Sequence, residues 1–242
     1  MKKTILAFVF ALLPALSVAS GAGVHLDKAD IDLSNQQSLQ RGARLFMNYC
    51  LSCHSAQYQR YNRMARDIGL TDTQVIDNLM FASDKVGETM TVAMRPEDAE
   101  KWFGATPPDL TLAARSRGVD WLYTYLRTFY ADDSRPTGAN NLVFDKVGMP
   151  NILWQLQGIQ KPVYAETEDG HKHIERLELV KEGSMTPAEF DQSVRDLVNF
   201  MAYIAEPVKL ERQRIGWWVL GFLVILFVFA YLLKKEYWKD VH

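Results

Sequence analysis

Residues 50–54 of this chain read Cys-Leu-Ser-Cys-His, and this short motif limits what the surrounding fold can be. On a helical turn, side chains three residues apart lie on one face, so Cys50 and Cys53 can form thioethers with the two vinyl groups of one porphyrin. The next residue, His54, then lies under the iron and can supply an imidazole ligand. The motif therefore predicts a fold that encloses one covalently attached haem c.

Other interpretations of the two cysteines agree less well with the rest of the sequence. A thioredoxin-like redox pair requires a neighbouring βαβ pattern, and none is visible. A structural zinc site requires four ligands, whereas the chain contains only two cysteines. A disulfide between them would close a very small loop in a chain of 242 residues.

Two apolar segments relate the chain to a membrane. Residues 1–19 combine a basic start, an apolar stretch and small residues before a cleavage site, which is typical of a signal peptide. Residues 215–233 form an uncharged segment that is long enough for one helix to cross a bilayer. Aromatic residues cluster at both of its ends. Three basic residues precede this segment and three follow it, so the charge rule does not orient it and the signal peptide does.

These segments predict the domain organisation. We expect an exported domain at residues 20–206, a linker at 207–214, the membrane helix at 215–233 and a cytoplasmic tail at 234–242. Loss of two lysines with the signal leaves 25 basic and 29 acidic residues, a net charge of −4. We expect a membrane partner and no nucleic-acid partner.

Apolar spacing predicts the helices of the exported domain. A helix over residues 34–55 leads into the haem motif, and a second begins with a capping box at Thr186 and ends before Pro207. A shorter helix is expected over residues 119–130. Residues 160–183 alternate polar and apolar positions, which is compatible with a loop or a small hairpin.

The position opposite His54 on the iron decides whether such a site passes electrons or binds a substrate. Met149 is the favoured ligand because it lies between a glycine and a proline, where an irregular backbone can direct its side chain at a flat ring. Met94 is a second candidate, and the other histidines stay open. Met47 shares the helix of the haem motif and would lie on the wrong side of the ring, and Met201 lies on an apolar helix face, where packing is the more usual role.

A proline-rich loop and two arginines add further candidates. Residues 106–110 read Thr-Pro-Pro-Asp-Leu, and adjacent prolines form a stiff segment suited to lie against a porphyrin, which makes Pro108 a candidate contact. An ordinary surface turn is equally compatible with this loop. Arg115 and Arg117 follow it, and a guanidinium can pair with a haem propionate, although most arginines are solvated.

Together these motifs resemble the cytochrome c1 family, the haem-bearing subunits of ubiquinol–cytochrome c reductase, the bc1 complex. The matching segments are Arg41-Gly42, the haem motif, Pro107 to Thr111 with the two arginines, Gly148-Met149-Pro150 and the C-terminal anchor. The resemblance implies a mainly α, cytochrome c-like domain in which the early and late helices cross. It also implies roles for matching residues: Cys50 and Cys53 hold the haem, His54 and Met149 ligate its iron, Pro108 lies in the haem loop, and Arg117 pairs with a propionate.

The resemblance also implies a function. The haem would take one electron from a Rieske iron–sulfur protein and pass it to a soluble or tethered cytochrome c, within a dimeric complex that contains cytochrome b. The haem domain would face the periplasm of a bacterial cell membrane, and no residue of the chain would be catalytic. Acidic groups could steer a basic partner; they are Glu97, Asp98, Glu100, Asp132 and Asp133.

Three alternatives remain at this point. Another membrane-anchored c-type cytochrome would feed a terminal oxidase or reductase, and its partner subunits would distinguish it. A peroxidase would need an open iron position. A haem-based sensor would need a signalling domain, and about nine residues follow the anchor.

Overall fold

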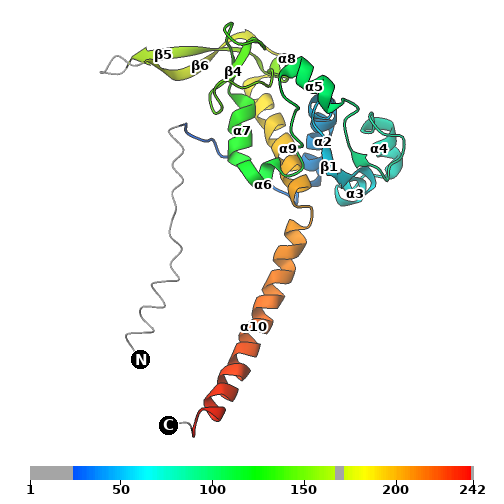
Figure 1. Ribbon diagram of the computed structural model, residues 1–242, viewed down its shortest axis with the longest axis vertical. Coiled ribbons are helices and arrows are strands. Elements are labelled where there is room, and N and C mark those ends of the chain that lie inside the picture. The colour runs from blue at the N-terminus through cyan, green and yellow to red at the C-terminus, as the bar shows by residue number, and fades with distance from the viewer. Residues whose placement is uncertain (1–23, 167–171, 241–242) are drawn as a thin grey trace.

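Helices dominate this chain, and one long helix extends away from the rest of the molecule (Figure 1). The computed structural model describes residues 24–166 and 172–240, so the expected signal peptide at residues 1–19 lies outside the described residues. The helices are α2 (Gln36–Leu45), the π-helix η1 (Phe46–Cys50), α3 (Tyr61–Asp67), α4 (Asp72–Asn78), α5 (Pro96–Phe103), α6 (Ala113–Arg117), α7 (Val119–Arg127), α8 (Trp154–Gln157), α9 (Pro187–Ala205) and α10 (Lys209–Tyr237). The strands are β1 (Ala56–Arg60), β2 (Thr89–Met90), β3 (Phe129–Ala131), β4 (Ala139–Asn141), β5 (Gly158–Glu166) and β6 (Lys172–Glu182).

Helices α2 and α9 pack closely against each other in the core, as the resemblance implied. Their closest approach is at Gly42, where an added Cβ would lie 2.1 Å from the backbone oxygen of Asp196. Only glycine permits two backbones to approach so closely. The rings of Phe46 and Phe200 meet beside this point with centroids 5.5 Å apart, and both are fully buried. The crossing therefore joins the segment before the haem motif to the last helix of the domain.

The predicted helix over residues 34–55 is interrupted. Helix α2 is capped by the Asn35 side chain, which accepts a hydrogen bond from the Ser38 amide, and it passes directly into η1. The amide of Leu51 donates to the Phe46 carbonyl at 3.0 Å, the five-residue spacing of a π turn. Such turns are frequent at functional sites, and this one ends at the first cysteine of the motif.

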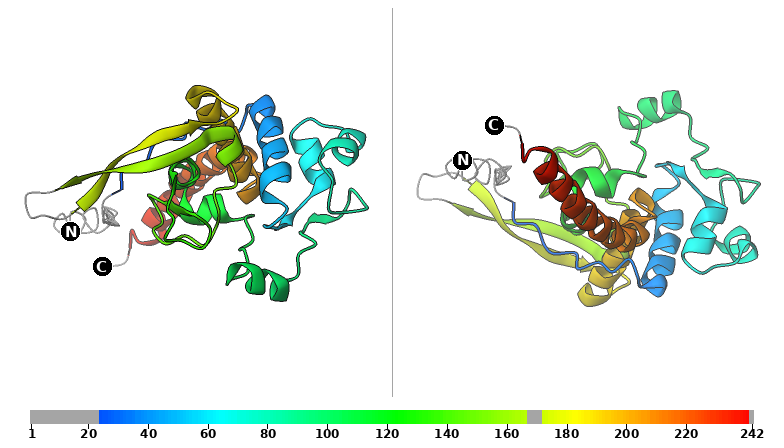
Figure 2. Two further views of the ribbon diagram at one scale, coloured as in Figure 1. Left: turned by 90° about the horizontal axis from the view of Figure 1, so that it is seen from above. Right: turned by 90° about the horizontal axis from the view of Figure 1, so that it is seen from below.

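The other expected elements are mostly confirmed. The capping box at Thr186 is present, with Thr186 and Glu189 bonding to each other's backbone amides. The described residues at 160–166 and 172–182 belong to β5 and β6, which pair as an antiparallel hairpin that projects from the domain (Figure 2). Helix α7, however, ends at Arg127 rather than near residue 130, because Phe129–Ala131 pair with β4 as an antiparallel strand. Adjacent aromatic residues favour a strand once a partner strand is available.

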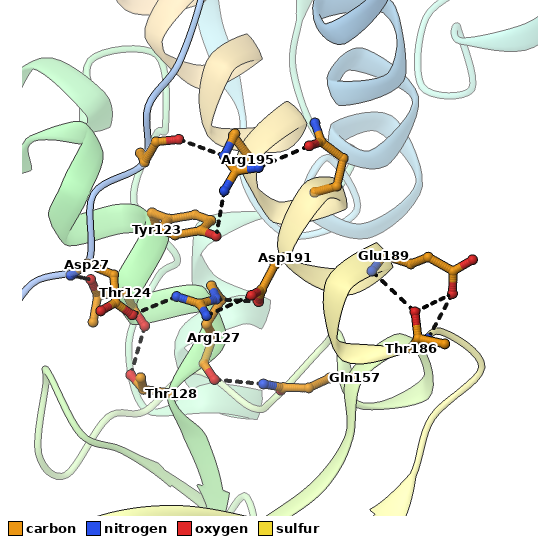
Figure 3. Close-up of polar contacts among 12 residues, drawn as sticks. Asp27, Tyr123, Thr124, Arg127, Thr128, Gln157, Thr186, Glu189, Asp191 and Arg195 are labelled. Atoms are coloured by element: carbon orange, nitrogen blue, oxygen red, sulfur yellow. Dashed lines mark hydrogen bonds and ion pairs between the residues drawn. The ribbon is translucent and has the colours of Figure 1, made fainter.

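An extended segment at residues 24–33 crosses α7 and α9. The Asp120 carboxylate accepts from the Ala29 amide at 3.0 Å and pairs with Lys28. The Arg195 guanidinium donates to the Ala29 carbonyl, and Arg127 bonds to both Asp27 and Asp191 (Figure 3). This segment, named here the N-terminal strap, ties the two helices together.

Helix α10 is the one helix among the described residues that is long and apolar enough to cross a membrane, with a mean hydropathy of 2.4 over an 18-residue stretch. It begins at Lys209 and ends at Tyr237, so it extends beyond residues 215–233 at both ends. Most of the segment expected as a linker, residues 207–214, is therefore helical. Figure 1 shows α10 leading directly away from the end of α9.

Candidate functional site

The Cys-Leu-Ser-Cys-His motif forms one tight turn after η1. The amides of Cys53 and His54 both donate to the Cys50 carbonyl, at 3.0 and 2.8 Å. Both thiols are free; Cys50 is buried, and Cys53 is partly exposed. Burial, with a smaller contribution from Cys53, raises the pKa of the Cys50 thiol to about 12. The two thiols and the imidazole thus come from a single turn, as the motif predicts.

The orientation of His54 is set by the proline loop. Its Nδ1 lies 2.7 Å from the carbonyl oxygen of Pro108. A carbonyl oxygen can only accept, so Nδ1 carries the hydrogen and Nε2 keeps the lone pair that could bind a metal. Burial is the largest influence on this imidazole and lowers its pKa, which favours the neutral form. Pro108 therefore acts through its backbone carbonyl, a role that the stiffness of a diproline loop does not by itself predict.

Two cavities adjoin at this histidine, with volumes of about 230 and 480 Å³. His54, Pro108 and Met149 line both of them, whereas Cys53 lines the first and Cys50 the second. The remaining lining of the first cavity is mainly apolar and includes Tyr49, Phe103, Pro107 and Ile152. The candidate ligands and both thiols therefore surround one apolar space.

Met149 reaches this space from a loop between β4 and α8. Its sulfur accepts a hydrogen bond from the Tyr125 hydroxyl at 3.4 Å. Met201 lines only the second cavity, and Met94 and Met47 line neither. His173 lies on β6, which contributes no residue to either cavity, and His171 lies outside the described residues.

The two candidate arginines are separated by the fold. Arg117, the last residue of α6, lines the second cavity, and its guanidinium carbon lies 5.3 Å above the ring centroid of Trp121. Arg115 lines neither cavity, and its charge acts instead on Glu206 at the end of α9, whose pKa is lowered mainly by Arg212. Among the residues that the structure describes, Arg117 thus supplies the single guanidinium in the cavity wall.

The sequence reasoning missed an aromatic row on α7. The rings of Trp121 and Tyr125 stack at 4.9 Å, and Tyr125 meets Phe129 edge to face at 5.1 Å. Trp121 and Tyr125 both line the second cavity. Their spacing of four residues places them on one face of a helix, so this pattern could have marked them as part of the site. Burial raises the pKa of Tyr125 to about 12, and its hydroxyl stays a hydrogen-bond donor at neutral pH.

The loop that carries Met149 is held by two asparagines, which the sequence reasoning also missed. Asn141 is buried; its side-chain oxygen accepts from the amides of Val143 and Phe144, and its nitrogen donates to the Tyr125 carbonyl at 2.7 Å. The side-chain oxygen of Asn140 accepts from the Lys146 amide at 2.8 Å. The backbone of this loop is therefore held by hydrogen bonds from side chains and not by the regular backbone hydrogen bonds of a helix or sheet.

The residues of this site fit a haem c. Two free thiols lie on one turn, a neutral imidazole and a thioether border the same apolar cavities, and a guanidinium lies at the wall. These are the groups needed for thioether attachment, axial ligation and pairing with a carboxylate. Together with one apolar helix at the C-terminus, they define a membrane-anchored c-type cytochrome.

Comparison with known proteins agrees with this class. The Cytochrome C1 family matches residues 29–241. Cytochrome c1 of Allochromatium vinosum is 54% identical over 244 residues, covering 100% of both chains. A protein of Nitrosomonas europaea named ammonia monooxygenase gamma subunit is 48% identical over 96% of this chain and 95% of its own, and cytochrome c1 of Blastochloris viridis is 28% identical over 98% and 95%.

The chain belongs to the cytochrome c1 family. It is an electron-transfer subunit that carries one covalently bound haem c, and it is anchored in a membrane. Its family places it in a bc1 complex with a cytochrome b and a Rieske protein.

Proposed function

We propose that this chain receives single electrons from the Rieske protein and delivers them to a cytochrome c through a haem held by six residues. Cys50 and Cys53 form the thioethers, and His54 and Met149 are the axial ligands. Arg117 pairs with a propionate, and Pro108 fixes His54. The main support is that His54 and Met149, 95 positions apart in the sequence, border both cavities, and that each cavity is also lined by one of the two thiols.

The bound haem supplies a one-electron couple, and the protein residues set its surroundings. His54 presents Nε2 because Pro108 holds Nδ1. A thioether ligand favours the reduced iron and raises the potential, which suits an acceptor of electrons that originate from quinol. With His54 and Met149 both binding the iron, a bound haem would have no place for a substrate, so the chain would need no acid, base or nucleophile. Its tasks are to enclose the haem, set its potential and present docking surfaces.

The direction of the anchor and the assembly state belong to the same proposal. We propose cleavage after about residue 19, a haem domain at residues 20–206 on the periplasmic side, and a short cytoplasmic tail after α10. The complex is a dimer, as expected for this family. An acceptor with a basic surface would meet the exposed carboxylates of α5, Glu97 and Glu100.

Replacement of Met149 by leucine tests the ligand assignment. The haem should stay attached and the potential should fall by on the order of 0.1 V, since axial ligands set haem potentials over a range of about 0.8 V. Redox titration of detergent-solubilised membranes measures this change. An unchanged potential would remove Met149 as the ligand.

Co-purification tests the partners. A tagged chain should isolate a cytochrome b and a Rieske protein, and oxidase or monooxygenase subunits in their place would support a different electron-transfer complex. The name of the Nitrosomonas europaea relative makes monooxygenase subunits a specific alternative to examine. Protease added outside spheroplasts should digest the haem domain; protection would reverse the proposed orientation.

A further inference from the structure

The Tyr125 hydroxyl makes a contact that the proposed electron transfer does not require. It donates to the Met149 sulfur at 3.4 Å, its one hydrogen bond among the described residues. The side chain is buried at the wall of the second cavity. A buried hydroxyl normally finds a stronger acceptor than a thioether, so its direction toward sulfur is a specific feature of this site.

The surroundings fix the tyrosine ring in this direction. Trp121 stacks on one face with an interplanar angle of 10°, and Phe129 meets the ring in an edge-to-face arrangement at 68°. The Tyr125 carbonyl accepts from Asn141, and the same asparagine holds the first turn of the loop that leads to Met149. The donor and the acceptor are therefore positioned by one shared residue.

A thioether sulfur has two lone pairs, so it can bind iron with one and accept a hydrogen bond with the other. A hydrogen bond draws electron density from the sulfur and makes it a weaker donor to oxidised iron. Reduced iron, which needs less donation, is then favoured. Hydrogen bonds to the ligands of a metal commonly orient them and tune the metal in this way.

We infer that Tyr125 is a positioning residue for Met149, orienting the thioether with its hydroxyl and raising the reduction potential of the haem. This inference rests on the proposed role of Met149 as the axial ligand. One neutral hydrogen bond should change the equilibrium between oxidised and reduced forms about three- to tenfold. For one electron this corresponds to about 30 to 60 mV.

The test compares Tyr125→Phe with Tyr123→Phe in the haem-loaded, membrane-extracted protein. Tyr123 is a matched control because it lies on the same helix and is also buried, but its hydroxyl accepts from Arg195 (Figure 3) and it lines neither cavity. Redox titration should show a potential lowered by about 30 to 60 mV for Tyr125→Phe and unchanged for Tyr123→Phe. The effect of Tyr125→Phe should disappear when Met149 is also leucine.

Three results would overturn the inference: an unchanged or raised potential for Tyr125→Phe, an equal decrease for Tyr123→Phe, or a decrease that persists without Met149. If Tyr125→Phe does not accumulate, Trp121→Phe replaces it, because this change keeps the hydroxyl but weakens the stacking that directs it. A smaller decrease then supports the inference, and no decrease contradicts it. An effect of Met149→Leu without an effect of Tyr125→Phe would leave the proposed function intact.

Discussion

The α2–α9 crossing and the Met149 loop are held together in different ways. The crossing buries apolar side chains and brings two backbones into contact at Gly42. The loop has little regular structure and depends on the side-chain hydrogen bonds of Asn140 and Asn141. The helix crossing maximises burial and tolerates almost no added volume. The loop fixes the orientation of a few groups by hydrogen bonds and leaves space for a large group.

The largest expected effect compares one substitution in both regions. Gly42→Ala should lower the free energy of unfolding by about 3 kcal/mol, because the new methyl group meets the Asp196 carbonyl and neither backbone can move alone. Gly148→Ala should change it by less than about 0.5 kcal/mol, because nothing lies within 4 Å of the added Cβ. Denaturant unfolding of the solubilised protein, followed by tryptophan fluorescence, measures both. Similar costs at the two glycines would mean that the two regions do not differ as described.

A second experiment removes the main polar support of the loop. Asn141→Ala should lower the free energy of unfolding by about 2 kcal/mol, because two amides and a carbonyl lose a buried hydrogen-bond partner. It should also lower the haem potential, since Tyr125 and Met149 lose their common support. Asn151→Ala, in the same loop but partly exposed, is the control and should cost less than about 1 kcal/mol. An unchanged haem potential in Asn141→Ala would mean that Asn141 stabilises the loop without affecting the haem site.

The N-terminal strap should give a smaller effect that depends on pH. The Ala29 amide, and then Lys28, lower the pKa of the Asp120 carboxyl. A lowered pKa stabilises the fold above the unfolded value of about 4, and this stabilisation is lost as the pH falls through the folded value. Asp120→Asn should therefore lower the free energy of unfolding by about 1 kcal/mol at neutral pH, and by progressively less as the pH falls below about 4. A loss of stability in Asp120→Asn that does not change with pH would mean that the charge of Asp120 contributes nothing to the fold.

The smallest effect is expected at the hairpin. Residues 163–176 can be replaced by Asn-Gly, because Pro162 and Leu177 already face each other across the two strands. None of the described residues in the removed part is buried, so the free energy of unfolding should change by less than about 0.5 kcal/mol and the haem potential should stay unaltered. Thermal unfolding and redox titration check this result, and a large loss of stability would show that the hairpin supports the core.

Local patterns predicted the elements whose causes are local. The cysteine motif, the capping box at Thr186 and the apolar segment near the C-terminus each follow from residues that are close in sequence, and all three appear in the structure. The end of α7 was misjudged because it depends on a pairing partner about ten residues later. No short-range pattern could show that Pro108 bonds His54, or that Asn141 joins Tyr125 to the Met149 loop, because these contacts exist only in the folded chain.

The connection between α9 and α10 consists of only three residues, from Glu206 to Val208, and Glu206 also pairs with Arg212 in the first turn of α10. So short a connection, with an ion pair across it, limits how far the haem domain can move away from the membrane helix. A carrier fixed in this way cannot travel between its donor and its acceptor. If the chain passes electrons between two partners as proposed, the movement that this transfer needs would come from those partners.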